Sequence, residues 1–149
     1  MIDIEIANQQ SQLAVDQDVL QQVAQAILHD HGPPTCRVSI AIVDDPTIHA
    51  LNRQYLQHDY ATDVLSFVLE QTPELLEGEI VVSSDTAQTQ AREYQWTAAQ
   101  ELLLYVIHGL LHLDGFDDQS DTQRAEMRCA EQTYLKQCGR LTRRVRHVE

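Results

Sequence analysis

Cysteine is scarce and long apolar runs are absent in this sequence of 149 residues. The three cysteines are an odd number without zinc-finger spacing, and none belongs to a recognisable catalytic signature. We therefore expect neither a disulfide framework nor a cysteine nucleophile. No apolar run approaches the ~20 residues of a membrane-spanning helix, and the N-terminus lacks the basic-then-apolar pattern of a secretion signal. These absences favour a cytoplasmic protein with no membrane partner.

Internal repeats, linkers and low-complexity segments are also absent. The length favours a single domain with a substantial core, and the hydrophobic content of 43% is near the norm for globular proteins. We predict one domain over residues 1–139, followed by a basic C-terminal tail over residues 140–149.

Positive charge is scarce as well. The formal net charge of −13 argues against a nucleic-acid partner. The tail is the exception, because its net charge of +3 leaves −16 on residues 1–139. Two interpretations of the tail stay open: an arm that contacts phosphate groups, or a solvated, disordered end. Its charged residues are Arg140, Arg143, Arg144, Arg146 and Glu149.

Hydrophobic periodicity predicts an α+β fold, with a sheet of about four strands, helices packed against it and one helix buried centrally. Strands are predicted over residues 2–6, 37–43, 64–69 and 78–83. Helices are predicted from 16 or 18 to about 31, from 45 to about 56, from 84 or 85 to about 94, from 97 onward, and from 120 to about 139. The expected N-caps are Asp16 or Asp18, Asp45, Ser84 or Asp85, Thr97 and Ser120, the last two in capping boxes with Gln100 and Gln123.

The predicted central helix carries two histidines four residues apart. Positions i and i+4 share one helix face, so His108 and His112 can bind a single ion. Gly115 favours a helix end and a chain reversal, which could bring Asp117 or Asp118 to the same ion. Two nitrogens and one oxygen, with a fourth position left for water, are the ligand set of a catalytic zinc.

A structural alternative is that both histidines are core residues bonded to backbone carbonyls, with the two aspartates capping the next helix. The flanking leucines and β-branched residues make the helix apolar nearly all round, which indicates burial. Histidine nitrogens in such surroundings need polar partners. The apolar flanks therefore favour the metal site.

The position after the first histidine excludes one known chemistry. Zinc peptidases with the pattern His-Glu-x-x-His place their general base there, whereas this chain has Gly109, which cannot accept a proton. Glycine in a helix costs roughly 1 kcal/mol relative to alanine, so we expect Gly109 to permit close approach of another segment or of substrate.

Two other acids have open roles. Asp117 either orients His112 or a bound water, or caps the following helix. Glu101 lies seven residues before His108 on the same helix, and is either a supporting acid or an ordinary first-turn acid.

The stretch from His108 to Asp118 resembles the YbeY family of metal-dependent endoribonucleases, also called rRNA maturation factors. The family pattern is His-Gly-x-Leu-His-Leu-x-Gly-Tyr-Asp-His. Further segments are similar to family motifs in the same order: Leu51-Asn-Arg-Gln-Tyr55, Thr62-Asp63-Val64-Leu65-Ser66-Phe67 and Gly78-Glu79-Ile80-Val81-Val82.

The resemblance implies a cytoplasmic enzyme with one zinc ion held by three side chains. It implies single-stranded RNA as substrate, a role in maturing the 3′ end of small-subunit (16S) rRNA, and a role in ribosome quality control. The implied partners are rRNA and the small ribosomal subunit with its associated proteins. His108 and His112 correspond to the family's first two ligands.

Two positions depart from the family pattern. The third ligand of the family is histidine, whereas this chain has Asp118, which suits manganese or another divalent metal better than imidazole does. The family's arginine after the tyrosine is Leu56 here. Arg53 on the same short helix is either its replacement as a phosphate contact or a solvated surface residue.

The sequence thus predicts a zinc-dependent endoribonuclease with His108, His112 and Asp118 as metal ligands. Asp117 and Arg53 are the candidate catalytic residues. Two alternatives stay open: a metallohydrolase with a non-RNA substrate, and a non-catalytic ribosome-associated factor.

Overall fold

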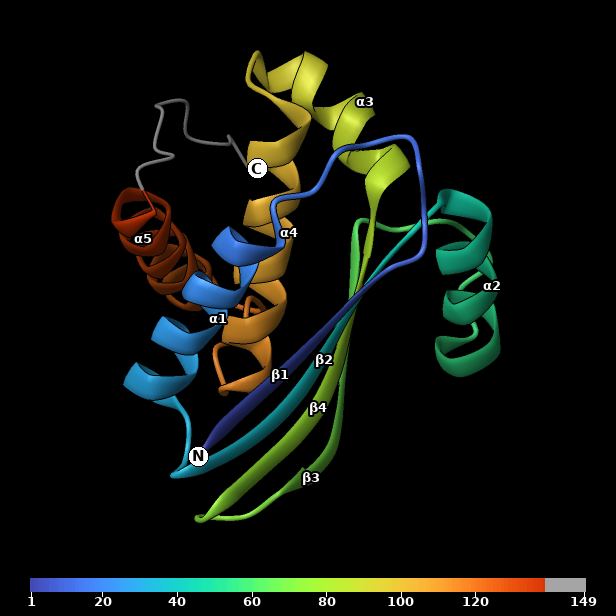
Figure 1. Ribbon diagram of the computed structural model, residues 1–149. Coiled ribbons are helices and arrows are strands. Elements are labelled where there is room, and N and C mark those ends of the chain that lie inside the picture. The colour runs from blue at the N-terminus through green and yellow to red at the C-terminus, as the bar shows by residue number, and fades with distance from the viewer. Residues whose placement is uncertain (139–149) are drawn as a thin grey trace.

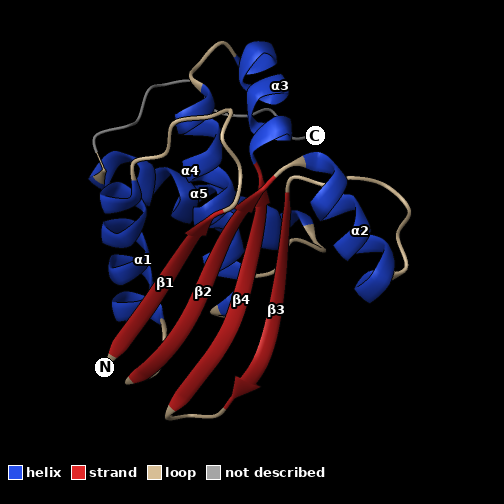
Figure 2. Cartoon of the chain, turned by 45° about the vertical axis from the view of Figure 1, so that its right-hand side comes forward, coloured by secondary structure: helices blue, strands red, loops and turns tan. Residues whose placement is uncertain are grey.

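A computed structural model describes residues 1–138, and in it one sheet separates helices on its two faces (Figure 1, Figure 2). Helices α1, α4 and α5 cover one face, α2 lies on the other, and α3 sits beyond one end of the sheet. The strands are β1 (Ile2–Asn8), β2 (Thr35–Val43), β3 (Val64–Gln71) and β4 (Leu75–Ser83). The helices are α1 (Gln17–His31), α2 (Asp45–Leu56), α3 (Ser84–Tyr94), α4 (Ala98–Leu113) and α5 (Asp121–Gln137).

The sheet is mixed, with strand order β1-β2-β4-β3. Strands β1, β2 and β4 run parallel, and register pairs such as Ile40 with Ile80 stack β-branched residues across the sheet. Strand β3 pairs antiparallel with β4 through a short turn and forms one edge. The predicted α+β domain with four strands is confirmed.

Helix α4 is the centre of the main hydrophobic core. From Glu101 to Leu113, every residue is buried except His108 and His112. A smaller core lies on the opposite face, where Ile48 of α2 packs with Val43, Leu65 and Val81 of the sheet. The predicted central buried helix is therefore confirmed.

Two predicted N-caps were wrong by one or two residues. Helix α2 is capped by Asp44, whose Oδ1 accepts the Thr47 N–H at 2.9 Å, so the expected cap Asp45 is already helical. Helix α3 is capped by Ser83, because β4 passes directly into α3 without a loop. The predicted alternatives Ser84 and Asp85 both lie inside that helix.

Asp45 and Asp85, which were expected to be N-caps, instead join the starts of α2 and α3. The Asp45 carboxylate accepts hydrogen bonds from the Ser83 hydroxyl at 2.5 Å and the Thr86 hydroxyl at 2.8 Å. In return, Asp85 Oδ2 accepts the Asp45 N–H at 2.8 Å. Each helix start is therefore held by a side chain of the other helix.

The other predicted caps are confirmed. Asp16 caps α1, and capping boxes begin α4 at Thr97 and α5 at Ser120.

Within residues 1–138, no helix is both long and apolar enough to cross a membrane. The predicted basic tail over residues 140–149 lies outside the described residues.

Gly109 allows α4 to pack tightly on the sheet. A Cβ atom there would lie 2.9 Å from Ile80 Cγ2 and 3.2 Å from both Ser66 Oγ and Val64 Cγ2. The Ser66 hydroxyl also donates to the Gly109 carbonyl at 3.3 Å. The expected close approach of another chain segment to Gly109 is confirmed. The alternative, close approach of a substrate, stays a prediction.

We predict that Gly109→Ala lowers the free energy of unfolding, although alanine is the better helix former. Overpacking against Ile80, a branched side chain on a strand, costs about 1–3 kcal/mol, whereas the helix-propensity gain is only about 1 kcal/mol. Denaturant unfolding of the two proteins, each with EDTA, measures the difference. A higher midpoint for the variant would contradict this packing.

Asp114 is the C-cap of α4, and among the carboxyl groups of the described residues its pKa departs most from the ordinary value. Both of its oxygens are buried and accept no hydrogen bond from residues 1–138. Burial raises the pKa of Asp114 to about 7. In the unfolded chain the pKa returns to about 3.9, so folding favours the protonated form between these values.

Stability should therefore fall as the pH rises from about 4 through about 7, because ionising Asp114 leaves a buried charge. We predict that Asp114→Asn, which resembles the neutral acid, raises the melting temperature at pH 8 and raises it less at pH 5. Thermal unfolding with EDTA at both pH values measures this, with Asp3→Asn, an exposed strand position, as the control. Equal effects at both pH values would disprove the assignment.

Candidate metal centre

Helix α4 presents His108 and His112 side by side, because four residues are close to one helical turn. Their Nε2 atoms lie 3.1 Å apart, and the two rings meet edge to face with centroids 4.6 Å apart. The side chains are only 27% and 28% exposed. These two histidines form the strip along which the otherwise buried residues 101–113 of α4 are exposed to solvent.

The turn after α4 brings an acid back to the histidine pair. Gly115 has φ +103°, a left-handed conformation that favours glycine, and its N–H bonds to the His112 carbonyl at 3.1 Å. Asp118 then places Oδ2 3.5 Å from His112 Nε2 and 3.8 Å from His108 Nε2. The predicted chain reversal at Gly115 is confirmed.

The three donor atoms suit a metal ion. One ring nitrogen of each histidine and one carboxylate oxygen of Asp118 all lie within 4.8 Å of one another. In a tetrahedral site with Zn–N bonds of ~2.0–2.1 Å, ligand atoms are about 3.3 Å apart. The imidazole pair is already near this spacing, and Asp118 is slightly farther out. Two facing imidazole nitrogens repel each other unless a proton or a cation lies between them, so the group could hold a metal.

Glu131, which was not among the residues predicted from sequence, supports the site from α5. Its Oε2 lies 2.6 Å from His108 Nδ1, and its side chain is only 12% exposed. The sequence held a signal, because Glu131 follows Met127 by four residues and precedes Tyr134 by three, which places it on the apolar stripe of the predicted helix. In the structure, Met127 and Tyr134 are buried. An acid on the inner stripe of a helix needs a partner.

The charges around His108 alter its protonation. Burial alone would lower the pKa of His108, but the hydrogen bond and charge of Glu131, followed by the charges of Asp63 and Asp118, outweigh it and raise the pKa. Negative charge thus gathers where a cation would bind, and the motif residue Asp63 is one of its sources.

Among residues 1–138, neither histidine ring makes a hydrogen bond to a backbone carbonyl, which the core alternative required. His108 bonds to the Glu131 carboxylate, and its Nε2 faces His112. The helix that follows is capped by Ser120 instead of either aspartate. Asp117 Oδ1 accepts the Asp118 N–H at 2.8 Å, so Asp117 helps to shape the turn that carries Asp118.

Two further residues lie away from the three donors. Glu101 is buried in the first turn of α4 and accepts the Trp96 indole N–H at 2.7 Å. Seven residues separate it from His108, which is about 10 Å along the helix. Arg53 is 65% exposed on α2, with its guanidinium 3.9 Å from Asp59. The structure records no ion pair between Arg53 and Asp118 among the described residues.

Comparison with known proteins identifies a family. The chain matches the family model described as Endoribonuclease YbeY over residues 5–139. A Rhodopirellula baltica protein named Endoribonuclease YbeY is 48% identical over 122 residues, which cover 80% of this chain and 63% of that protein. A protein of the same name from Syntrophotalea carbinolica is 38% identical over 137 residues, covering 86% of this chain and 91% of that protein.

A solved structure agrees with the fold. The solution structure of TM1509 from Thermotoga maritima superposes with a TM-score of 0.63 at 30% sequence identity. The match covers 93% of this chain and 89% of that one. Fold, motif order and sequence similarity therefore agree, and the chain belongs to the Endoribonuclease YbeY family.

Proposed function

We propose that this protein is a metal-dependent endoribonuclease that cleaves single-stranded RNA, with zinc as its metal. The observation that carries the proposal is the convergence of His108, His112 and Asp118 on one point. The names of its relatives supply the substrate class. Bound zinc would polarise a phosphoryl oxygen and lower the pKa of a water molecule to ~7, which provides a nucleophile at neutral pH.

The chain's own residues would divide the remaining work. His108, His112 and Asp118 hold and orient the metal. Asp117, with one carboxylate oxygen engaged by the Asp118 N–H, keeps the other to accept a hydrogen bond from the attacking water. Because Arg53 lies on α2 and pairs only loosely with Asp59, we assign it to a phosphate remote from the cut.

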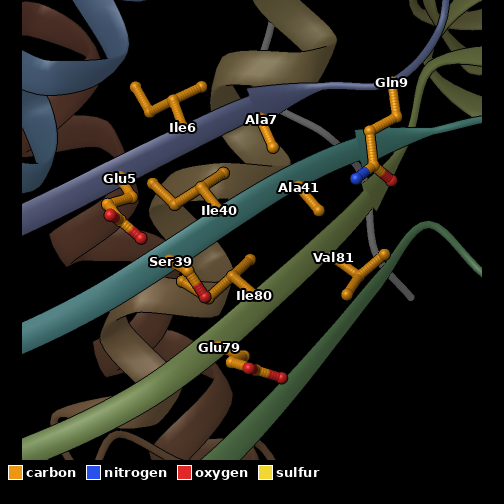
Figure 3. Close-up of a pocket in the computed structure, with 10 residues that line it drawn as sticks. All are labelled: Glu5, Ile6, Ala7, Gln9, Ser39, Ile40, Ala41, Glu79, Ile80 and Val81. Atoms are coloured by element: carbon orange, nitrogen blue, oxygen red, sulfur yellow. The ribbon is translucent and has the colours of Figure 1, made fainter.

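The charge distribution restricts how RNA can approach. The face of the sheet that carries α2 has a hollow of about 550 Å³ that is lined partly by Glu5 of β1 and Glu79 of β4 (Figure 3). Carboxylates on this face repel phosphate groups. We infer that RNA reaches the metal centre from the side of α4 and the turn that follows it.

The biological role follows from the family resemblance. We propose cytoplasmic maturation of the 3′ end of 16S rRNA and participation in ribosome quality control, with the small ribosomal subunit and its associated proteins as partners. The acidic body and the Asp59 contact of Arg53 favour one alternative, a metallohydrolase with a non-RNA substrate. A non-catalytic ribosome-associated factor is the other.

Metal binding is the first test. We predict that the purified protein retains about one equivalent of zinc after dialysis, and that His112→Ala retains less than about a tenth. Asp118→His should keep zinc and bind manganese less well, because imidazole favours zinc and carboxylate favours manganese. Elemental analysis and chelator competition measure both, with His29→Ala, an exposed helix histidine, as the control. Full zinc retention by His112→Ala would reject this site.

RNA cleavage is the second test. With zinc or manganese, the wild type should cut a labelled single-stranded RNA, and a duplex of the same sequence should resist. His112→Ala should lower the rate more than about 100-fold, since even loss of an outer-sphere partner costs 10–100-fold. Gel analysis of the products measures this.

The same assay separates the alternatives. If the metal-loaded wild type leaves RNA intact but hydrolyses a generic phosphate ester, the substrate proposal is wrong. If it binds metal and hydrolyses neither, the protein is not the enzyme proposed.

A further inference from the structure

Helix α5 contributes a carboxylate to the metal centre from outside the recognised motif. Glu131 lies 23 residues beyond His108, and its Oε2 is 2.6 Å from His108 Nδ1. The Glu131 side chain is 12% exposed, so the contact is well shielded from water. A short contact with little exposure holds the imidazole ring in one orientation.

We propose that Glu131 is a positioning residue that sets the tautomer and orientation of His108 for metal binding. This inference rests on the proposed function, because it assumes that the site holds a divalent cation. Glu131 itself does not reach the metal, since it contacts the nitrogen on the far side of the ring.

The tautomer follows from hydrogen-bond chemistry. An ionised carboxylate only accepts hydrogen bonds, so it selects the imidazole form with the proton on Nδ1. That form leaves the Nε2 lone pair free, and Nε2 is the atom that faces His112 and Asp118. Without Glu131, the imidazole can carry its proton on Nε2, where it would block the metal.

The charge of Glu131 acts in the same direction. Two neutral imidazoles and Asp118 bring one negative charge to the ion, and Glu131 adds a second through His108. The cluster then balances the charge of one dication. A carboxylate bonded to the outer nitrogen also makes the imidazole a better donor.

A purely structural role makes the opposite prediction for metal binding. If Glu131 served only to pair with a doubly protonated His108, that proton would compete with the metal at Nε2. Removing the negative charge would then strengthen metal binding. The sign of the change in affinity therefore separates the two roles.

The test compares Glu131→Gln and Glu131→Ala with wild type and with Glu126→Gln. Glutamine keeps the size of the side chain but can donate to Nδ1 and select the other tautomer. Glu126 is exposed on the same helix, so its variant controls for the loss of one negative charge on α5. Circular dichroism confirms that each variant is folded, and the glutamine variant serves if the alanine variant is not.

We expect zinc affinity, measured by chelator competition, to fall about 10–100-fold in both Glu131 variants and to be unchanged in Glu126→Gln. Cobalt absorption spectra of the loaded proteins should shift only in the Glu131 variants. In metal-free protein at a pH above the raised pKa of His108, where the imidazole is neutral, ¹⁵N NMR of the ring nitrogens should show the Nδ1–H form of His108 in wild type and its loss in Glu131→Gln.

Unchanged or tighter zinc binding in Glu131→Gln would overturn the proposal, as would an Nε2–H tautomer of His108 in the wild type. The NMR result needs neither metal nor RNA cleavage. If His108 has the expected tautomer but no variant or wild type binds zinc, the proposed function fails while the positioning of the ring by Glu131 stands.

Discussion

The geometry of the candidate metal centre depends on the burial of α4. A helix that is enclosed by α1, α3, α5 and the sheet has few places for a polar side chain, and the two histidines occupy the only strip between Glu101 and Leu113 that is not fully buried. Burial holds the backbone of this strip rigid, since packed interiors resist small displacements. Gly109 extends that rigidity to the sheet by removing the side chain that would separate α4 from β3 and β4. The same contacts that stabilise the fold therefore also fix the positions of the two imidazoles in the candidate metal centre.

The features that could be predicted from sequence are those set by local geometry. The pairing of His108 with His112 follows from helical period, and the return of Asp118 follows from the glycine turn. The N-caps at Thr97 and Ser120 were also predictable, because the capping box is a local pattern. The caps of α2 and α3 were not, because acids and hydroxyls occupy several consecutive positions there and tertiary contacts decide which of them caps.

Glu131 and Arg53 depend on how whole helices are oriented. Glu131 reaches His108 only because α5 docks beside α4. The spacing within α5 marks Glu131 as an inward-facing acid, but nothing in the sequence shows that His108 is its partner. The rotation of α2 about its axis decides whether Arg53 faces solvent or the candidate metal centre, and spacing along the chain does not determine that rotation. The structure places its guanidinium near Asp59 in the following loop.

The mutual capping of α2 and α3 has a mechanical consequence. The first turn of α2 is tied to the end of β4, and Ile48 in its next turn is fully buried, whereas Tyr55 and Leu56 in its last turn are 60% and 45% exposed. The start of α2 is therefore fixed to the sheet more firmly than its end, which keeps the buried Asn52 and the contact of Tyr55 with Phe67. A ligand that contacts Arg53 would therefore bind toward the less firmly held end of α2, away from the hydrogen bonds of Asp45 that join this helix to Ser83 and Thr86.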